Sequence, residues 1–233
     1  MESIKLSNQV EMPMEGFGVF QVEEQACEQV VLDAIASGYR LIDTASSYQN
    51  EEAVGRAIRS CGVPREELYR TGRVRAIGVC NFLPDRLLDL CYNAEIRPQV
   101  NQIERHPHYQ RAEELQLMRE LGVQPQAWAP FAEGLKGMFE EPVLMEIAGK
   151  YGKTPAQVIL RWNVQQGVIV IPKSVHRERM EENLEIWDFA LDAKDMEKIK
   201  ALDTGSPSML DTRKISEVKR VYDYLNNPVL TSL

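Results

Sequence analysis

A carboxylate and a phenol stand close together after a predicted strand near the amino terminus. In the stretch LIDTASSYQNE, Asp43 ends an apolar run and Tyr48 follows it, just before a predicted helix that opens at Asn50 and Glu51. A tyrosine hydroxyl can act as a general acid, and a nearby aspartate makes a plausible acid–base arrangement. Aspartate at a strand end also serves as a simple helix cap, so this cluster alone leaves both interpretations open.

Basic side chains follow a second apolar run, in the stretch VIVIPKSVHRERMEEN. Lys173 stands at the end of the predicted strand and Arg179 near the start of the next helix, in a chain whose formal net charge is −8. Cations at the start of a helix form a typical binding site for phosphate. The pattern therefore favours a phosphate-binding site over the competing interpretation, a solvated pair of charges.

Predicted strands and helices alternate along the chain and must position these side chains. The predicted strands are residues 16–22, 40–45, 74–82, 98–104, 124–131 and 168–174. Such alternation predicts parallel βαβ units, and its repetition favours an α/β fold of the (β/α)8 TIM-barrel type over a doubly wound sheet. No GxGxxG motif follows the first strand, which also argues against a doubly wound dinucleotide-binding fold. Residues 4–14 predict an N-terminal β-hairpin.

This barrel is predicted to be incomplete, because about six parallel strands are found where a closed barrel of this type has eight. The 233 residues and 44% hydrophobic content suit a single domain, residues 1–233. The negative charge makes nucleic acid and anionic membranes poor candidates for partners. No secretory leader and no apolar run of membrane-spanning length are found, so we predict a cytoplasmic protein.

Cysteine and histidine usage points away from disulfides and metals. The four cysteines are widely spaced without a CxxC motif, which is typical of reduced thiols. The three histidines include no HExxH motif, so we predict no metal site.

Taken together, these stretches closely resemble the aldo-keto reductase family, in particular its bacterial-type reductases of small carbonyl compounds. The resemblance runs from GFGVFQ to ALDTG, and LIDTASSYQNE and the IPKS stretch both stand at their proper strands. It implies hydride transfer from NADPH to an aldehyde or ketone. A small-molecule carbonyl substrate is then the expected partner, and we expect a monomer.

The resemblance also implies roles for individual residues. Tyr48 is the general acid, and Asp43 pairs with a family lysine that tunes the tyrosine. The residues implied to bind the cofactor are Gly18, Val19, Asn81, Gln102, Trp128, Lys173, Ser174, Arg179, Glu182 and Asn183. Cys80 and Ala129 depart from the family, which commonly has serine at both positions; a thiol is the weaker hydrogen-bond partner.

The stretch ELYRTGRVRAIGVCNF joins two distant parts of the family pattern. Residues 63–69 resemble the segment that leads into the third strand, whereas residues 68–79 resemble the end of the fourth helix and the fifth strand. Two βα units, about 60 residues at roughly 30 per unit, are therefore predicted to be absent, with an internal deletion near 67–73. In the family these units carry the catalytic lysine and a catalytic histidine. His106 is the histidine best placed to substitute.

Three interpretations follow from the missing units. The chain is an NADPH-dependent oxidoreductase by lineage whose activity is impaired, because an unpaired Asp43 disfavours the phenolate of Tyr48. Alternatively, it is a non-catalytic remnant that binds NADPH or folds poorly. The third interpretation is an error in the gene model that hides an intact enzyme.

Overall fold

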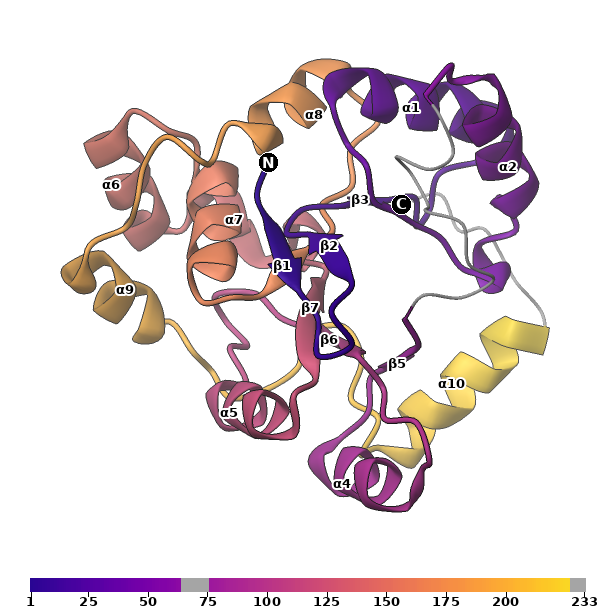
Figure 1. The fold of residues 1–233 in the computed structure, drawn as a ribbon. Helices are drawn as coiled ribbons and strands as arrows, with labels where there is room; N and C mark the ends of the chain where they lie inside the picture. The colour runs from indigo at the N-terminus through magenta and orange to yellow at the C-terminus, as the bar shows by residue number, and fades with distance from the viewer. Residues whose placement is uncertain (64–75, 227–233) are drawn as a thin grey trace.

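The computed structural model describes residues 1–63 and 76–226 of the chain, and Figure 1 shows its helices arranged around a group of central strands. The segment 67–73, where the sequence predicts the deletion, lies outside the described residues. The predicted hairpin is present: β1 (Ser3–Lys5) pairs antiparallel with β2 (Glu11–Pro13). In the turn of this hairpin, the hydroxyl of Ser7 donates to Gln99 Oε1 over 2.6 Å. Gln99 directly precedes the strand β6 (Val100–Glu104), so the hairpin lies at the amino ends of the strands.

Six parallel strands follow within the described residues, which confirms the predicted number. They are β3 (Phe17–Gly18), β4 (Ile42–Asp43), β5 (Gly78–Cys80), β6 (Val100–Glu104), β7 (Gln124–Trp128) and β8 (Ile169–Val170). Strands β5 to β8 pair in sequence order, and β3 pairs with β4. Backbone bonds from Gly16 to Val170 O (2.8 Å) and from Gly18 to Pro172 O (3.0 Å) place β3 beside β8.

The resulting strand order is β4-β3-β8-β7-β6-β5. Within the described residues, 1–63 and 76–226, β4 and β5 are not paired, so the described strands do not close a barrel. These two edges, which a third and a fourth strand would separate in a complete barrel, are not paired with each other within the described residues. This agrees with the linkage between strand number and barrel geometry, because six strands cannot reuse the closure of eight.

Helices follow the strands as the sequence predicts. They are α1 (Glu24–Ser37), α2 (Glu51–Ser60), α4 (Pro84–Asn93), α5 (Ala112–Leu121), α6 (Pro142–Tyr151), α7 (Pro155–Gln165), α8 (Arg177–Leu184), α9 (Ala193–Lys200) and α10 (Ile215–Asn226). Local signals set their ends: Gly38 closes α1 in the left-handed region at φ 118°, and Thr154 opens α7 with a capping box before Pro155. Two short 3₁₀ segments, η1 (Ser46–Tyr48) and η2 (Ala132–Glu140), follow β4 and β7.

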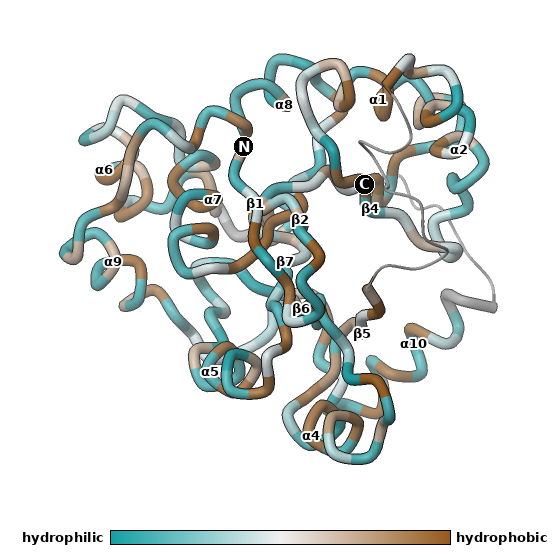
Figure 2. Tube along the Cα trace, viewed as in Figure 1, coloured by the Kyte–Doolittle hydropathy of each residue, from teal (hydrophilic) through white to brown (hydrophobic). Residues whose placement is uncertain are grey.

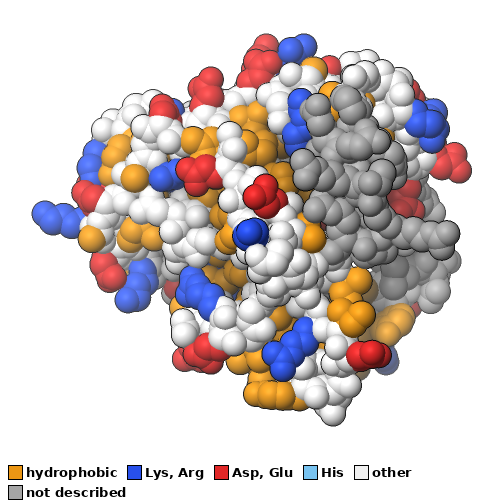
Figure 3. Space-filling model, in the orientation of Figure 1, with side chains coloured by type: hydrophobic (Ala, Val, Ile, Leu, Met, Phe, Trp, Pro, Cys, Tyr) orange, Lys and Arg blue, Asp and Glu red, His pale blue; other side chains and the backbone are white. Residues whose placement is uncertain are grey.

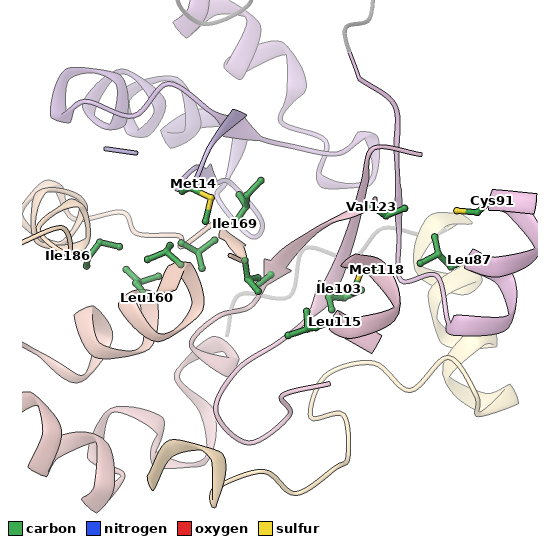
Figure 4. Packing of buried hydrophobic residues seen from close by; sticks show 14 residues of the cluster. Met14, Leu87, Cys91, Ile103, Leu115, Met118, Val123, Leu160, Ile169 and Ile186 are labelled. Carbon is green, nitrogen blue, oxygen red and sulfur yellow. The ribbon is translucent and has the colours of Figure 1, made fainter. Parts of the chain in front are cut away.

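Apolar side chains pack between the strands and the helices. One cluster joins β6, β7 and β8 to α4, α5 and α7, and Figure 4 shows Ile103, Met118, Leu160 and Ile169 among its members. A second cluster packs α1 and α2 against β3. Figure 2 shows the hydrophobic residues along the central strands and much of the hydrophilic sequence on the outer turns of the helices. On the face shown in Figure 3, acidic and basic side chains are interspersed rather than gathered by sign.

Candidate active site

The carboxyl ends of the strands bring together polar side chains that are far apart in the sequence. Asp43 ends β4, Gln102 lies in β6, and Gln126 lies at the matching register position of β7. The side-chain amide of Gln102 donates to Asp43 Oδ1 over 2.9 Å and to Gln126 Oε1 over 3.0 Å. Both amide hydrogens of Gln102 are therefore used within the protein.

Asp43 is a partly buried carboxylate with a neutral partner. Burial raises the pKa of Asp43, and the hydrogen bond from Gln102 offsets only part of that rise. No lysine, arginine or histidine among the described residues forms an ion pair with Asp43. Among the described residues, the hydrogen-bond partner of Asp43 is therefore the neutral amide of Gln102.

Tyr48 is held by the short segment that follows β4. Its ring packs against Phe20 with 5.0 Å between the ring centroids. Asn50 fastens this segment to the loop after β3, since its side-chain amide donates to Val19 O over 2.9 Å and to Val22 O over 3.0 Å. The predicted general acid thus sits on a fixed loop at the carboxyl end of the strands.

Asn81 and Trp128 contact each other across the ends of β5 and β7. The indole Nε1 of Trp128 donates to Asn81 Oδ1 over 2.8 Å, and Asn81 Nδ2 lies 3.3 Å from Cys80 Sγ. Asn81 adopts the left-handed conformation at φ 57°, which asparagine tolerates better than most residues. Burial, followed by the charge of Asp43, raises the pKa of Cys80 to about 11, so the thiol stays protonated at neutral pH.

The first parallel strand brings Gly18 and Val19 to the same end. Gly18 pairs in register with Asp43, and Val19 is fully buried. A Cβ atom on Gly18 would lie 3.3 Å from Ile171 O, so the glycine permits the close approach of β3 and β8.

The predicted phosphate-binding residues lie together at the end of β8 and in the first turn of α8. Lys173 and Arg179 are exposed, and neither forms an ion pair with any described residue. By contrast, Arg177 in the same helix pairs with Glu181 over 2.9 Å. Ser174 is nearly buried, and its hydroxyl exchanges hydrogen bonds with the backbone of His176, which shapes the turn into α8. Two unpaired cations are therefore available to an anion.

Glu182 and Asn183 follow in the second half of α8. The carboxylate of Glu182 accepts a hydrogen bond from Thr154 Oγ1 over 2.7 Å, and Asn183 is buried. Both residues lie on the predicted helix, but the described contacts bind it to α7 and to the core. Their roles toward adenine remain predictions.

His106 lies just past the end of β6 and contacts Glu104. The ring is fully buried, and its Nε2 lies 3.2 Å from Glu104 Oε1. The hypothesis that His106 replaces the missing histidine is therefore not supported, because the ring already contacts a carboxylate at the end of β6.

Two polar residues of this face, Gln126 and Glu104, were not predicted from the sequence as site residues. Gln126 stands two positions before Trp128, so the period of two in a strand places both on one face, and a polar residue in a buried strand was the available signal. Glu104 carries no local signal for its role in holding residues 208–210, because the three backbone amides that it accepts from lie more than 100 residues away.

Other features can be reported more briefly. All four cysteines are free thiols, as predicted. Within residues 1–63 and 76–226, no three His, Cys, Asp or Glu side chains gather into a group that could hold a metal ion. Over the same residues, each helix is too short or too polar to cross a membrane.

Comparison with known proteins agrees with this arrangement. The Aldo/keto reductase family model matches residues 16–68 and 65–204, two segments that share residues 65–68. A glyoxal reductase of Bacillus subtilis (strain 168) is 38% identical over 258 residues, covering 86% of this chain and 92% of the relative. A structure of a Gox0644 mutant in complex with NADPH has a TM-score of 0.79 at 29% identity, covering 87% of this chain and 93% of that one.

One relative also bears on the missing units. Morphine 6-dehydrogenase of Pseudomonas putida is 35% identical over 287 residues, covering 92% of this chain and 97% of the relative. Because this chain has only 233 residues, at least 54 positions of that alignment are occupied in the relative alone. The excess length and the break in the family match at 65–68 are consistent with a truncated barrel. The chain belongs to the aldo/keto reductase family.

Proposed function

We propose that this chain binds NADPH and reduces aldehydes and ketones only weakly, with Tyr48 as the general acid. The observation that carries the proposal is a contrast between two ends of the site: Lys173 and Arg179 form no ion pair with a described residue, whereas Asp43 is bonded to the amide of Gln102. The glyoxal reductase relative and the NADPH complex of Gox0644 support this class of substrate and cofactor.

The residues present fit the phosphate end of NADPH. Lys173 and Arg179 supply positive charge beside the first turn of α8, where backbone amides also favour an anion. Trp128 presents an aromatic ring at the end of β7, on which the nicotinamide would stack. When bound, NADPH supplies the hydride, and the chain's own residues must hold it and deliver a proton.

Proton delivery is the weak step. Tyrosine has an ordinary pKa of about 10, so it needs a nearby cation to become an efficient acid at neutral pH. The described partner of Asp43 is neutral, and a carboxylate without a cation disfavours the phenolate that proton transfer leaves behind. General acid–base catalysis contributes about 10²–10⁴-fold, and we expect a loss of that order.

Two measurements on the same preparation test the proposal. NADPH fluorescence should titrate with a micromolar dissociation constant, while turnover of glyoxal should fall about 10²–10⁴-fold below that of the Bacillus subtilis glyoxal reductase. Tyr48→Phe should abolish the residual turnover, whereas Tyr92→Phe, at an exposed helix position, should not. Turnover within tenfold of the relative would contradict the predicted impairment.

The alternatives have their own readouts. A cooperative melt without NADPH binding would contradict the cofactor proposal, and the absence of a cooperative melt would favour the poorly folding remnant. The nucleotide sequence across codons 64–75, together with the intact mass, decides between a deletion and an error in the gene model.

A further inference from the structure

Glu104 collects more hydrogen bonds than its place in a strand requires. It ends β6, is 2% exposed, and accepts from three consecutive backbone amides of a distant segment. Its Oε1 accepts from Ser208 over 2.6 Å and from Met209 over 2.9 Å, and its Oε2 accepts from Leu210 over 3.0 Å.

This arrangement requires the ionised form of the side chain. His106 Nε2 adds a fourth contact at 3.2 Å. Burial alone would raise the pKa of Glu104, but the bonds from His106 and the three amides outweigh it and hold the pKa below its usual range. An ionised carboxylate is acceptor-only on both oxygens, whereas a protonated acid or an amide presents a donor at one of them.

The segment that binds Glu104 belongs to the chain between α9 and α10. We call residues 206–214 the C-terminal strap. Just before it, the Thr204 hydroxyl donates to His108 O over 2.7 Å, and within it Met209 O accepts from Arg220 of α10 over 3.1 Å. The strap therefore connects the end of β6 to the last helix.

The strap also faces a residue of the predicted cofactor site. A small cavity is lined by Asn81, Leu83 and Glu104 together with the strap residues Pro207, Leu210 and Thr212. The position of the strap thus sets the width of the space beside Asn81.

We propose that Glu104 is the anchor that fixes the C-terminal strap at the carboxyl ends of β5 and β6, and that it thereby positions the wall formed by Pro207, Leu210 and Thr212 beside Asn81. The anchor acts through charge: both oxygens must accept at once. The proposal does not depend on cofactor binding, so it stands or falls separately from the proposed reductase function.

Hydrogen exchange of the unmodified chain provides the first test. A peptide spanning residues 205–212 should exchange at least about tenfold more slowly than an unstructured peptide of the same sequence, because its amides are bonded and buried at Glu104. Exchange at the unstructured rate would overturn the proposal, and this measurement needs no variant.

Glu104→Gln provides the second test, since it keeps the shape and removes the second acceptor. We expect exchange of this peptide and trypsin cleavage after Arg213 and Lys214, both exposed, to become about tenfold faster or more. Cleavage within α8 and α9 should not change. Glu141→Gln, which removes the carboxylate that lies 3.5 Å from His108, is the matched control and should leave the strap unaffected.

Ser208→Pro complements this variant, because it removes an amide donor and leaves Glu104 intact. It should also free the strap, and Glu104→Asp should retain more protection than Glu104→Gln. Equal protection in the Gln variant would show a merely steric role and overturn the proposal. Should Glu104→Gln fail to fold, the proline variant and the wild-type exchange decide the question.

Discussion

The region after β8, where α8 begins, and the region at the carboxyl ends of β4 and β5 differ in how their charged side chains are paired. At β8–α8, Lys173 and Arg179 project from a strand and helix that are both present, with no described residue neutralising either cation. Within the described residues β4 and β5 are not paired with each other, and Asp43 accepts a hydrogen bond from Gln102 of β6. The residues predicted to bind phosphate are present at one end, and at the other end no described cation pairs with Asp43.

The contrast follows from how a barrel of βα units divides its work. Each unit contributes side chains at the carboxyl end of its own strand, so removing two units deletes their residues without altering the sequence of the others. A phosphate site made by one strand and the next helix is local and survives. An ion pair between two different units does not.

The largest expected effect concerns the predicted phosphate-binding residues after β8. Lys173→Ala combined with Arg179→Ala should weaken NADPH binding about 10²–10⁴-fold, since each charge-assisted hydrogen bond contributes about 1.5–3 kcal/mol and about 1.4 kcal/mol corresponds to a tenfold change. NADH, which lacks the 2′-phosphate, should lose little. Fluorescence titration measures both, and Arg177→Ala is the matched control because Arg177 is paired with Glu181. An equal loss for NADH would place the phosphate elsewhere.

A second prediction concerns the buried carboxylate of Glu15, just before β3. Glu15 is fully buried, and neither of its carboxylate oxygens lies in good hydrogen-bond geometry with a described residue. Burial raises the pKa of Glu15 to about 8, and the amino terminus and the Tyr39 hydroxyl offset only part of that rise. Above its ordinary pKa of 4.5 the unfolded chain loses this proton while the folded chain keeps it, so the free energy of unfolding falls as pH rises from about 4.5 to about 8.

Glu15→Gln should remove this dependence. Between pH 6 and pH 8 the unmodified chain should lose about 2 kcal/mol more than the variant, as one pKa unit corresponds to about 1.4 kcal/mol. Urea unfolding at several pH values measures the difference. Glu146→Gln, at an exposed ion pair with Lys198, serves as the control. Parallel pH profiles for the unmodified chain and Glu15→Gln would show that Glu15 is not the group responsible.

A third prediction concerns the hydrogen bond between Gln102 and Asp43. Gln102→Leu removes the donor to Asp43 and should lower the free energy of unfolding by about 1–3 kcal/mol, the cost of an unsatisfied buried acceptor. Asp43→Asn in the same chain should recover part of the loss, because the neutral amide no longer needs the donor. Chemical denaturation of the single and double variants measures the coupling. Strictly additive effects would mean that this bond does not couple the two side chains.

The smallest expected effect concerns the family departure at β5. Cys80→Ser should tighten NADPH binding by no more than about threefold, since a hydroxyl is a stronger hydrogen-bond partner than a thiol but each neutral bond adds only about 0.5–1.5 kcal/mol. Fluorescence titration again gives the readout. A tenfold change in either direction would show that position 80 does more than support Asn81.

The sequence predicted the strands and helices well, because their signals are local. The alternation of β3 to β8 with helices, the hairpin, and the stops at Gly38 and Gly122 all follow from periodicity and turn residues. It predicted less well where the backbone leaves the regular pattern. The stretch 124–131 was predicted as one strand, but β7 ends at Trp128, and Ala129, Ala132 and Glu133 turn the chain with positive φ values.

The sequence by itself predicted the family, the set of residues at the strand ends, and the absence of the units that carry a lysine and a histidine in the family pattern, since motifs and their spacing are written along the chain. Only the tertiary structure decided which side chains meet. Gln102 bonds to Asp43 across 59 residues, and Glu104 reaches the C-terminal strap across more than 100. Such pairs depend on which strands lie side by side, and a buried polar group takes the nearest partner that this packing offers.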